Sequence, residues 1–133
     1  MAGEKILLVD DEEDFVEIVS AELEAEGFEV VTAHSGEEAR EKAPSEKPDA
    51  IVLDVMMETK TEGFKVAREL RQRDDTKEIP LIMLTGVNQE YSFEFGPDSI
   101  WLPVDTFLEK PVDADRLVGE LRTQLDKSSD NAE

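Results

Sequence analysis

The chain has 133 residues, the usual size of one compact domain and too short for two ordinary ones. It carries 34 Asp and Glu residues against 14 Lys and Arg residues, a net charge of −20, which argues against binding to nucleic-acid phosphates or anionic membranes. There is no cysteine, so disulfides, thiolate metal sites and a cysteine nucleophile are excluded. A hydrophobic share of 39% and the lack of a signal-peptide pattern at the start predict a soluble, cytoplasmic, single domain.

Five short segments along the chain predict β-strands, and the continuous apolar runs among them, such as 6–9 and 50–53, are typical of strands that are buried on both faces. The segments cover residues 6–9, 28–33, 50–53, 81–84 and 106–109. Helical patterns alternate with them, which predicts right-handed crossovers and a parallel sheet with helices on both faces. Functional residues in such a sheet gather where the strands end, at its carboxyl edge.

The first two helices have recognisable ends. Apolar residues recur at helical spacing in the first of them: Phe15, Ile18, Val19 and Leu23. We expect Gly27 to close that helix in the left-handed conformation. A capping box formed by Ser35 and Glu38 begins the second helix, which we expect to stop at Pro44.

The second half of the chain is less regular. A third helix begins near Gly63, and the apolar stripe of a final helix runs from Ala114 to Leu125. The segment 87–105 contains Gly and Pro residues that interrupt both helix and strand patterns, so the sequence leaves a further helix there open. We expect the domain to span residues 1–126 and the polar residues 127–133 to fray or to begin a linker.

Residues that carry chemistry stand at the ends of four of these strands: Asp10, Asp11, Asp54, Thr85 and Lys110. The acids at 10–14 also suit the start of a helix, where carboxylates interact favourably with the helix dipole. Solubility, however, explains poorly why an acid ends a fully apolar strand. Neighbouring carboxylates repel by about 4 kcal/mol at an effective dielectric of ~20, and a hard cation or a lysine usually offsets this repulsion. An oxygen-only ligand set favours Mg²⁺ over Zn²⁺.

The pairs Asp10-Asp11 and Lys110-Pro111, with Asp54 and Thr85 between them, resemble the response-regulator receiver domain of two-component signalling, the CheY-like family. The resemblance covers roughly residues 4–126, and its specificity comes from the agreement in identity, order and place on the strands. It implies an α/β, flavodoxin-like, doubly wound fold with a five-stranded parallel sheet in the order 2-1-3-4-5. It also implies a bacterial signalling protein that catalyses only its own phosphorylation and dephosphorylation.

The resemblance assigns a role to each matching acid. Asp54 corresponds to the residue that accepts a phosphoryl group from a phosphohistidine. Asp10, Asp11, Asp54 and the main-chain carbonyl of Met56 correspond to the ligands of Mg²⁺, with Mn²⁺ as an alternative ion. A carboxylate nucleophile beside a metal ion agrees with the general chemistry of phosphoryl transfer.

Three further roles are implied by the same resemblance. Lys110 pairs with the phosphoryl oxygens, Thr85 hydrogen-bonds the phosphoryl group, and Phe107 changes rotamer on activation. The implied partners are a sensor histidine kinase or phosphotransfer protein and a downstream protein target. The negative charge of the chain argues against direct contact with nucleic acid or with a membrane. The implied assembly is a monomer or a phosphorylation-dependent dimer.

Two stretches depart from the family pattern, which leaves alternative functions open. In the loop after Asp54, Glu58 occupies the position where the family usually has a proline, and Gly63 lies one residue further along the chain than the usual glycine. The segment 85–110 is longer than in the family pattern. A receiver that is not phosphorylated and serves only for docking is one alternative. A Mg²⁺-dependent aspartyl phosphohydrolase fits less well. In enzymes of that class the first strand is followed by two acids separated by one residue, whereas Asp10 and Asp11 of this chain are adjacent. A flavodoxin-like nucleotide or flavin site is disfavoured because the acids at 10–14 repel phosphate.

Overall fold

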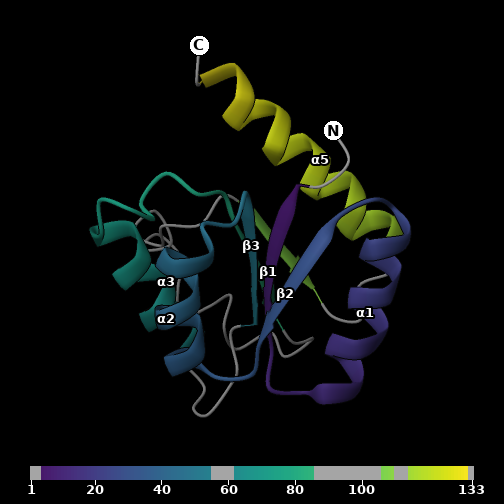
Figure 1. The fold of residues 1–133 in the computed structure, drawn as a ribbon, viewed down its shortest axis with the longest axis horizontal. Coiled ribbons are helices and arrows are strands. Elements are labelled where there is room, and N and C mark those ends of the chain that lie inside the picture. Colours follow the sequence, from purple (N-terminus) through teal and green to yellow (C-terminus); the bar gives the residue numbers. More distant parts are fainter. Residues whose placement is uncertain (1–3, 55–61, 86–105, 110–113, 132–133) are drawn as a thin grey trace.

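A computed structural model describes residues 4–54, 62–85, 106–109 and 114–131, and a parallel sheet forms its centre (Figure 1). The strands are β1 (Lys5–Val9), β2 (Glu29–Ala33), β3 (Ala50–Asp54), β4 (Leu81–Thr85) and β5 (Thr106–Glu109). They pair in the order β2-β1-β3-β4-β5, and every pairing is parallel. The predicted fold class and strand order are confirmed.

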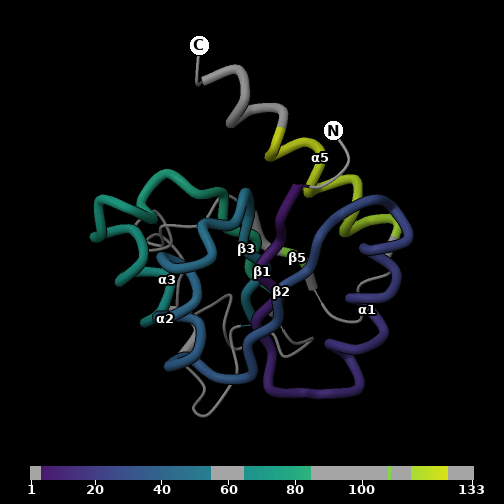
Figure 2. The backbone as a smooth tube through the Cα atoms, in the orientation of Figure 1, coloured from purple at the N-terminus to yellow at the C-terminus, as the bar shows by residue number. Residues whose placement is uncertain are grey.

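Helices cover both faces of the sheet. They are α1 (Glu13–Ala25), α2 (Gly36–Glu46), α3 (Glu62–Gln72) and α5 (Ala114–Asn131). In Figure 1, α2 and α3 lie on one side of the strands and α1 and α5 on the other, and Figure 2 follows the same chain path as a tube. The segment 87–105, where the sequence leaves a helix open, lies outside the described residues.

Two hydrophobic cores result, one on each face of the sheet. Leu7 and Val9 of β1 pack with α2 and α3, whereas Ile6 and Leu8 pack with α1 and α5. Successive side chains of a strand point to opposite faces, so a strand that contributes to both cores must be apolar at every position. This accounts for the continuous apolar runs, because both faces of the strand are buried.

Helix α1 ends as its sequence predicts. Gly27 has a φ of 101°, a conformation that costs glycine little. Its N–H donates to the carbonyl of Glu24 at 3.0 Å, and the N–H of Phe28 donates to that of Leu23 at 3.1 Å. This pair of bonds is a Schellman motif, which satisfies carbonyls that the helix leaves without a partner.

The predicted apolar stripe of α1 is wrong at one position. Ile18 is 61% exposed, and the buried residues of the helix are Val16, Val19 and Leu23. Residues spaced by three and four, such as these, lie on one face of a helix. Ile18 is adjacent in sequence to Val19, so it lies about 100° around the helix from that face.

Helix α2 begins as predicted and ends later than predicted. The Ser35 hydroxyl accepts a hydrogen bond from the N–H of Glu38 at 3.1 Å, and a Glu38 carboxylate oxygen accepts one from the N–H of His34 at 2.6 Å. Pro44 does not stop the helix, which continues to Glu46. The proline lies in the last turn, so the loss of its N–H affects only one bond near the end of the helix.

Helix α5 is longer than its apolar stripe. The polar segment after residue 126, which the sequence predicts to fray, is helical up to Asn131, and these last turns project beyond the sheet in Figure 1. Leu117, Leu121 and Leu125 anchor the earlier turns in the core shared with α1. Once these turns are formed, each added residue gains a backbone hydrogen bond, so a helix extends more easily than it begins.

Candidate functional site

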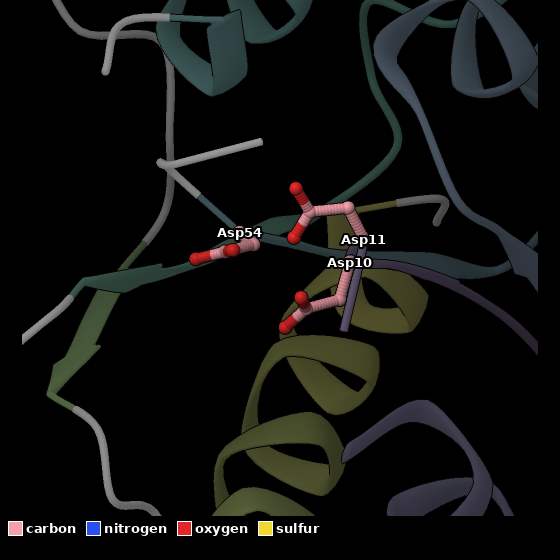
Figure 3. A group of neighbouring side chains, drawn as sticks. All are labelled: Asp10, Asp11 and Asp54. Carbon is pink, nitrogen blue, oxygen red and sulfur yellow. The ribbon is translucent and has the colours of Figure 1, made fainter. Parts of the chain in front are cut away.

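Three carboxylates meet at the carboxyl edge of the sheet. β1 and β3 are neighbours, and their register pairs Val9 with Leu53, so Asp10 and Asp54 follow at the same level. Asp11 comes next in the turn that leads to α1. One carboxylate oxygen of each acid lies within 4.8 Å of those of the other two. Figure 3 shows the three side chains directed to the same side of the strand ends.

The three acids differ in their exposure to water. Asp10 is 0% exposed and Asp54 is 5% exposed, whereas Asp11 is exposed. Charged groups with so little exposure need hydrogen bonds or a counter-charge to compensate for lost hydration. The site therefore has two carboxylates in the protein interior and a third at its mouth.

Main-chain groups hold Asp10 in place. Its Oδ1 accepts a hydrogen bond from the N–H of Glu12 at 2.9 Å, and its own N–H donates to the carbonyl of Ala33 in β2 at 3.1 Å. The sequence motifs did not identify Glu12 as part of the site. The available signal was an Asp two residues before a helix N-cap, since Asp side chains commonly bond the backbone two residues further on.

The electrostatics of this arrangement favour a bound cation. Two carboxylates at about 4 Å repel by about 4 kcal/mol at an effective dielectric of ~20, and by less where water screens the exposed Asp11. The donor atoms are carboxylate oxygens, which are the preferred protein ligands of Mg²⁺. The three residues therefore fit a hard divalent cation.

The other predicted site residues are only partly described. The main chain of Thr85 ends β4, and the preceding Leu84 is in register with Asp54, so the end of β4 reaches the same edge of the sheet. The side chains of Thr85 and Phe107 lie outside the described part of the structure. So do Met56 and Lys110, together with the altered loop that contains Glu58. Their roles stay predictions.

The amino edge of the sheet has different features. Arg73 donates to the carboxylate of Asp75 at 3.1 Å, and this bond is the main cause that lowers the pKa of Asp75 and raises that of Arg73. Both residues are in the connection from α3 to β4. A hollow of about 390 Å³ opens at the same edge, and Asp75 and Ile79 are among its lining residues. These features lie at the opposite edge of the sheet from the three carboxylates.

Comparison with known proteins agrees with this geometry. The family model of the response regulator receiver domain matches residues 6–122. The chain is 43% identical over 109 residues to the alkaline phosphatase synthesis transcriptional regulatory protein PhoP of Bacillus subtilis, covering 82% of this chain and 43% of that protein. It is 35% identical to the DNA-binding dual master transcriptional regulator RpaA of Synechocystis, covering 91% of this chain and 48% of that protein. The chain thus spans about half the length of these relatives.

A solved structure shows the same architecture. The CheY-like response regulator receiver domain protein of Methanospirillum hungatei superposes with a TM-score of 0.85 at 25% sequence identity, covering 98% of this chain and 99% of that one. Within the part of the chain that is described, no helix is both long and apolar enough to cross a membrane. The match covers the sheet and the acidic site, so this chain belongs to the response regulator receiver domain family, the phospho-accepting module of two-component signalling.

Proposed function

We propose that Asp54 is the phosphoryl acceptor of this receiver and that Asp10 and Asp11 hold Mg²⁺ beside it. The observation that carries the proposal is the convergence of the three carboxylates within 4.8 Å at the carboxyl edge of the sheet. Asp54 is the last residue of β3, a strand paired on both sides by β1 and β4. A nucleophile at such a position is held by a rigid element, as phosphoryl transfer requires.

The reaction that this geometry supports is an in-line transfer. An Asp54 carboxylate oxygen attacks the phosphorus of a phosphohistidine, and an O–P bond forms while the N–P bond breaks. The imidazole nitrogen keeps the electron pair of the broken bond and takes up a proton. When bound, Mg²⁺ supplies positive charge that offsets the repulsion between the phosphoryl oxygens and the carboxylates.

We assign Lys110 and Thr85 to the phosphoryl group, as the family pattern implies. The register of β4 and β5 supports this, because it pairs Thr85 with Glu109, the residue before Lys110. The main chains of Thr85 and Glu109 thus lie side by side at the edge of the sheet where Asp54 lies. A lysine and a hydroxyl are suitable groups to bind phosphoryl oxygens.

The partners that we propose are proteins. A sensor histidine kinase or a phosphotransfer protein donates the phosphoryl group in the cytoplasm, and a downstream protein reads the phosphorylated state. The net charge of −20 supports protein contacts rather than nucleic-acid contacts for these residues. RpaA is named as a DNA-binding regulator, but this chain covers only 48% of it.

Phosphorylation by a small donor tests the proposal directly. Incubation with acetyl phosphate and Mg²⁺ should add the mass of one phosphoryl group to the intact chain. Asp54→Asn should prevent this addition, because an amide is a poor nucleophile. Asp74→Asn is a matched control, since Asp74 is an exposed aspartate that pairs with Lys77, and this variant should react like the wild type.

Two results would overturn the assignment. If Asp54→Asn gains the same mass as the wild type, the acceptor is another residue. If the folded wild type gains no mass from acetyl phosphate or from phosphoramidate, the chain is a receiver that serves only for docking.

A further inference from the structure

The turn between β1 and α1 uses a main-chain bond to hold the first carboxylate of the site. Oδ1 of the buried Asp10 accepts from the N–H of Glu12 at 2.9 Å. The same N–H cannot serve the helix, because α1 begins at Glu13 and its first N–H groups have no partner within the helix. The N–H of Glu12 is thus available to the site at no cost in helical hydrogen bonds.

The main chain of Glu12 is itself held in place. Glu12 is the N-cap of α1, with φ −92° and ψ 103°, and its side chain makes no capping hydrogen bond. Its carbonyl accepts the N–H of Val16 at 3.0 Å, which is a helical hydrogen bond. The N–H that faces Asp10 is therefore positioned by the first turn of α1, and Asp10 is fixed on its other side by β2 through Ala33.

We propose that the N–H of Glu12 is a positioning group that sets the orientation in which Asp10 faces Asp11 and Asp54. The inference rests on the proposed function, in which these three acids hold Mg²⁺. Loss of this bond removes one restraint on rotation of the Asp10 carboxylate about its Cβ–Cγ bond, a rotation that would reduce its repulsion from the neighbouring carboxylates. With this bond, the carboxylate is already oriented before the cation binds, which is what hydrogen bonds to metal-ligating side chains commonly achieve.

Proline substitution removes this N–H and retains the carbonyl. We expect Glu12→Pro to weaken the binding of MgCl₂ by about tenfold, measured by isothermal titration calorimetry on the whole chain. Glu12→Ala keeps the N–H and should bind within about twofold of the wild type. Glu13→Pro places proline at the first helical position, which accepts it readily, and should also bind like the wild type.

The pattern of affinities among the variants decides whether this N–H acts on the site. The inference is overturned if Glu12→Pro binds as tightly as the wild type, or if Glu12→Ala loses as much affinity as Glu12→Pro. If the wild type binds no Mg²⁺ at all, the proposed metal site itself is wrong. Equal weakening by Glu13→Pro also overturns the inference, because it assigns the effect to the helix start in general.

A measurement without proline is independent of whether Glu12→Pro folds. In the metal-free wild type, the amide proton of Glu12 should exchange with water more slowly than in Asp10→Ala, measured by NMR. The NMR signal of this amide should also shift on addition of MgCl₂. The MgCl₂ concentration at the midpoint of this shift should agree with the dissociation constant measured by calorimetry. An exchange rate that is the same in both proteins overturns the inference, because Asp10 then does not hold that proton.

Discussion

At the scale of single residues, the site combines two buried acids with one that is exposed. Asp10 and Asp54 are part of the protein interior, and their positions follow from the strands that they end. Asp11 follows Asp10 in the turn and reaches the other two from the solvent side. The charge of Asp11 is thus the one that can be removed with the least disturbance of the core.

The substitution Asp11→Asn should distinguish the effect of carboxylate repulsion on stability from the effect of Mg²⁺ binding. With one negative charge removed, the metal-free protein should melt at a higher temperature than the wild type. In the wild type, Mg²⁺ that binds only the folded state adds about 2.7 kcal/mol at a hundredfold excess over its dissociation constant, so the melting temperature should rise with millimolar Mg²⁺. This increase should be much smaller in Asp11→Asn, as measured by calorimetry.

The control for this experiment is Asp14→Asn, which removes an exposed charge from the same acidic stretch but outside the three-carboxylate group. It should retain the full increase with Mg²⁺. A wild-type increase no larger than that produced by a monovalent salt at equal ionic strength would contradict the metal site.

At the scale of elements, α1 shows how the position on a helix decides what a side chain contributes. Its buried side chains Val16, Val19 and Leu23 pack in the core that includes α5, while Ile18 is exposed. Arg122 of α5 reaches the end of α1, where its guanidinium is 3.3 Å from a Glu26 carboxylate oxygen and 5.3 Å from the centre of the Phe28 ring. The apolar contacts are buried and the ion pair is exposed, so the apolar contacts dominate the stability of this helix pair.

Alanine at two adjacent positions of α1 tests this description. Val19→Ala should lower the free energy of unfolding by about 2 kcal/mol, because it leaves a cavity in the core. Ile18→Ala should change it by less than about 0.5 kcal/mol, since little apolar burial is lost and alanine favours the helix. Urea denaturation measures both, and a loss at Ile18 as large as that at Val19 would contradict the observed helix orientation.

At the scale of the whole molecule, the strand order connects the three-carboxylate site to β4 and β5. β3 lies between β1, which leads to Asp10 and Asp11, and β4, which ends at Thr85. β4 in turn pairs with β5, where Met83 is in register with Phe107. A change at Asp54 therefore has a short path through neighbouring strands to Thr85 and Phe107.

Beryllofluoride with Mg²⁺, used as a phosphoryl mimic at Asp54, should reveal this coupling. New acceptor atoms beside Thr85 and Lys110 should draw both residues inward, and Phe107 should then rotate into the vacated space. We expect larger amide shifts by NMR at Thr85, Phe107 and residues 87–101 than in α1 beyond Phe15. Thr85→Ala should still accept a phosphoryl group and lose most of the distant shifts.

Shifts that stay confined to the loops around Asp10, Asp11 and Asp54 would contradict the switch. The resting and active states must differ by only a few kcal/mol for one modification to select between them. A confined response would therefore mean that the second state is too high in energy, and the chain would act as a phosphate sink or a docking module.

Local sequence was enough to determine the strands and most of the helix ends. Residues 6–9, 50–53 and 81–84 of β1, β3 and β4 are buried on both faces of the sheet, which restricts these positions to apolar residues and makes the strands recognisable as continuous apolar runs in the sequence. Gly27 and Ser35 act through bonds to residues nearby in the sequence, so their caps were predicted correctly. The acids at the strand ends were recognisable for the same reason, because they interrupt apolar runs.

Tertiary structure decided what depends on distant neighbours. The exposure of Ile18 is set by which face of α1 the sheet and α5 cover, and spacing alone did not distinguish that face. The extension of α2 past Pro44 depends on the energy of the whole helix, which tolerates one lost bond near its end. Asp10, Asp11 and Asp54 come within 4.8 Å of one another because β1 and β3 are neighbours, and strand pairing is a long-range contact that local residue preferences do not encode.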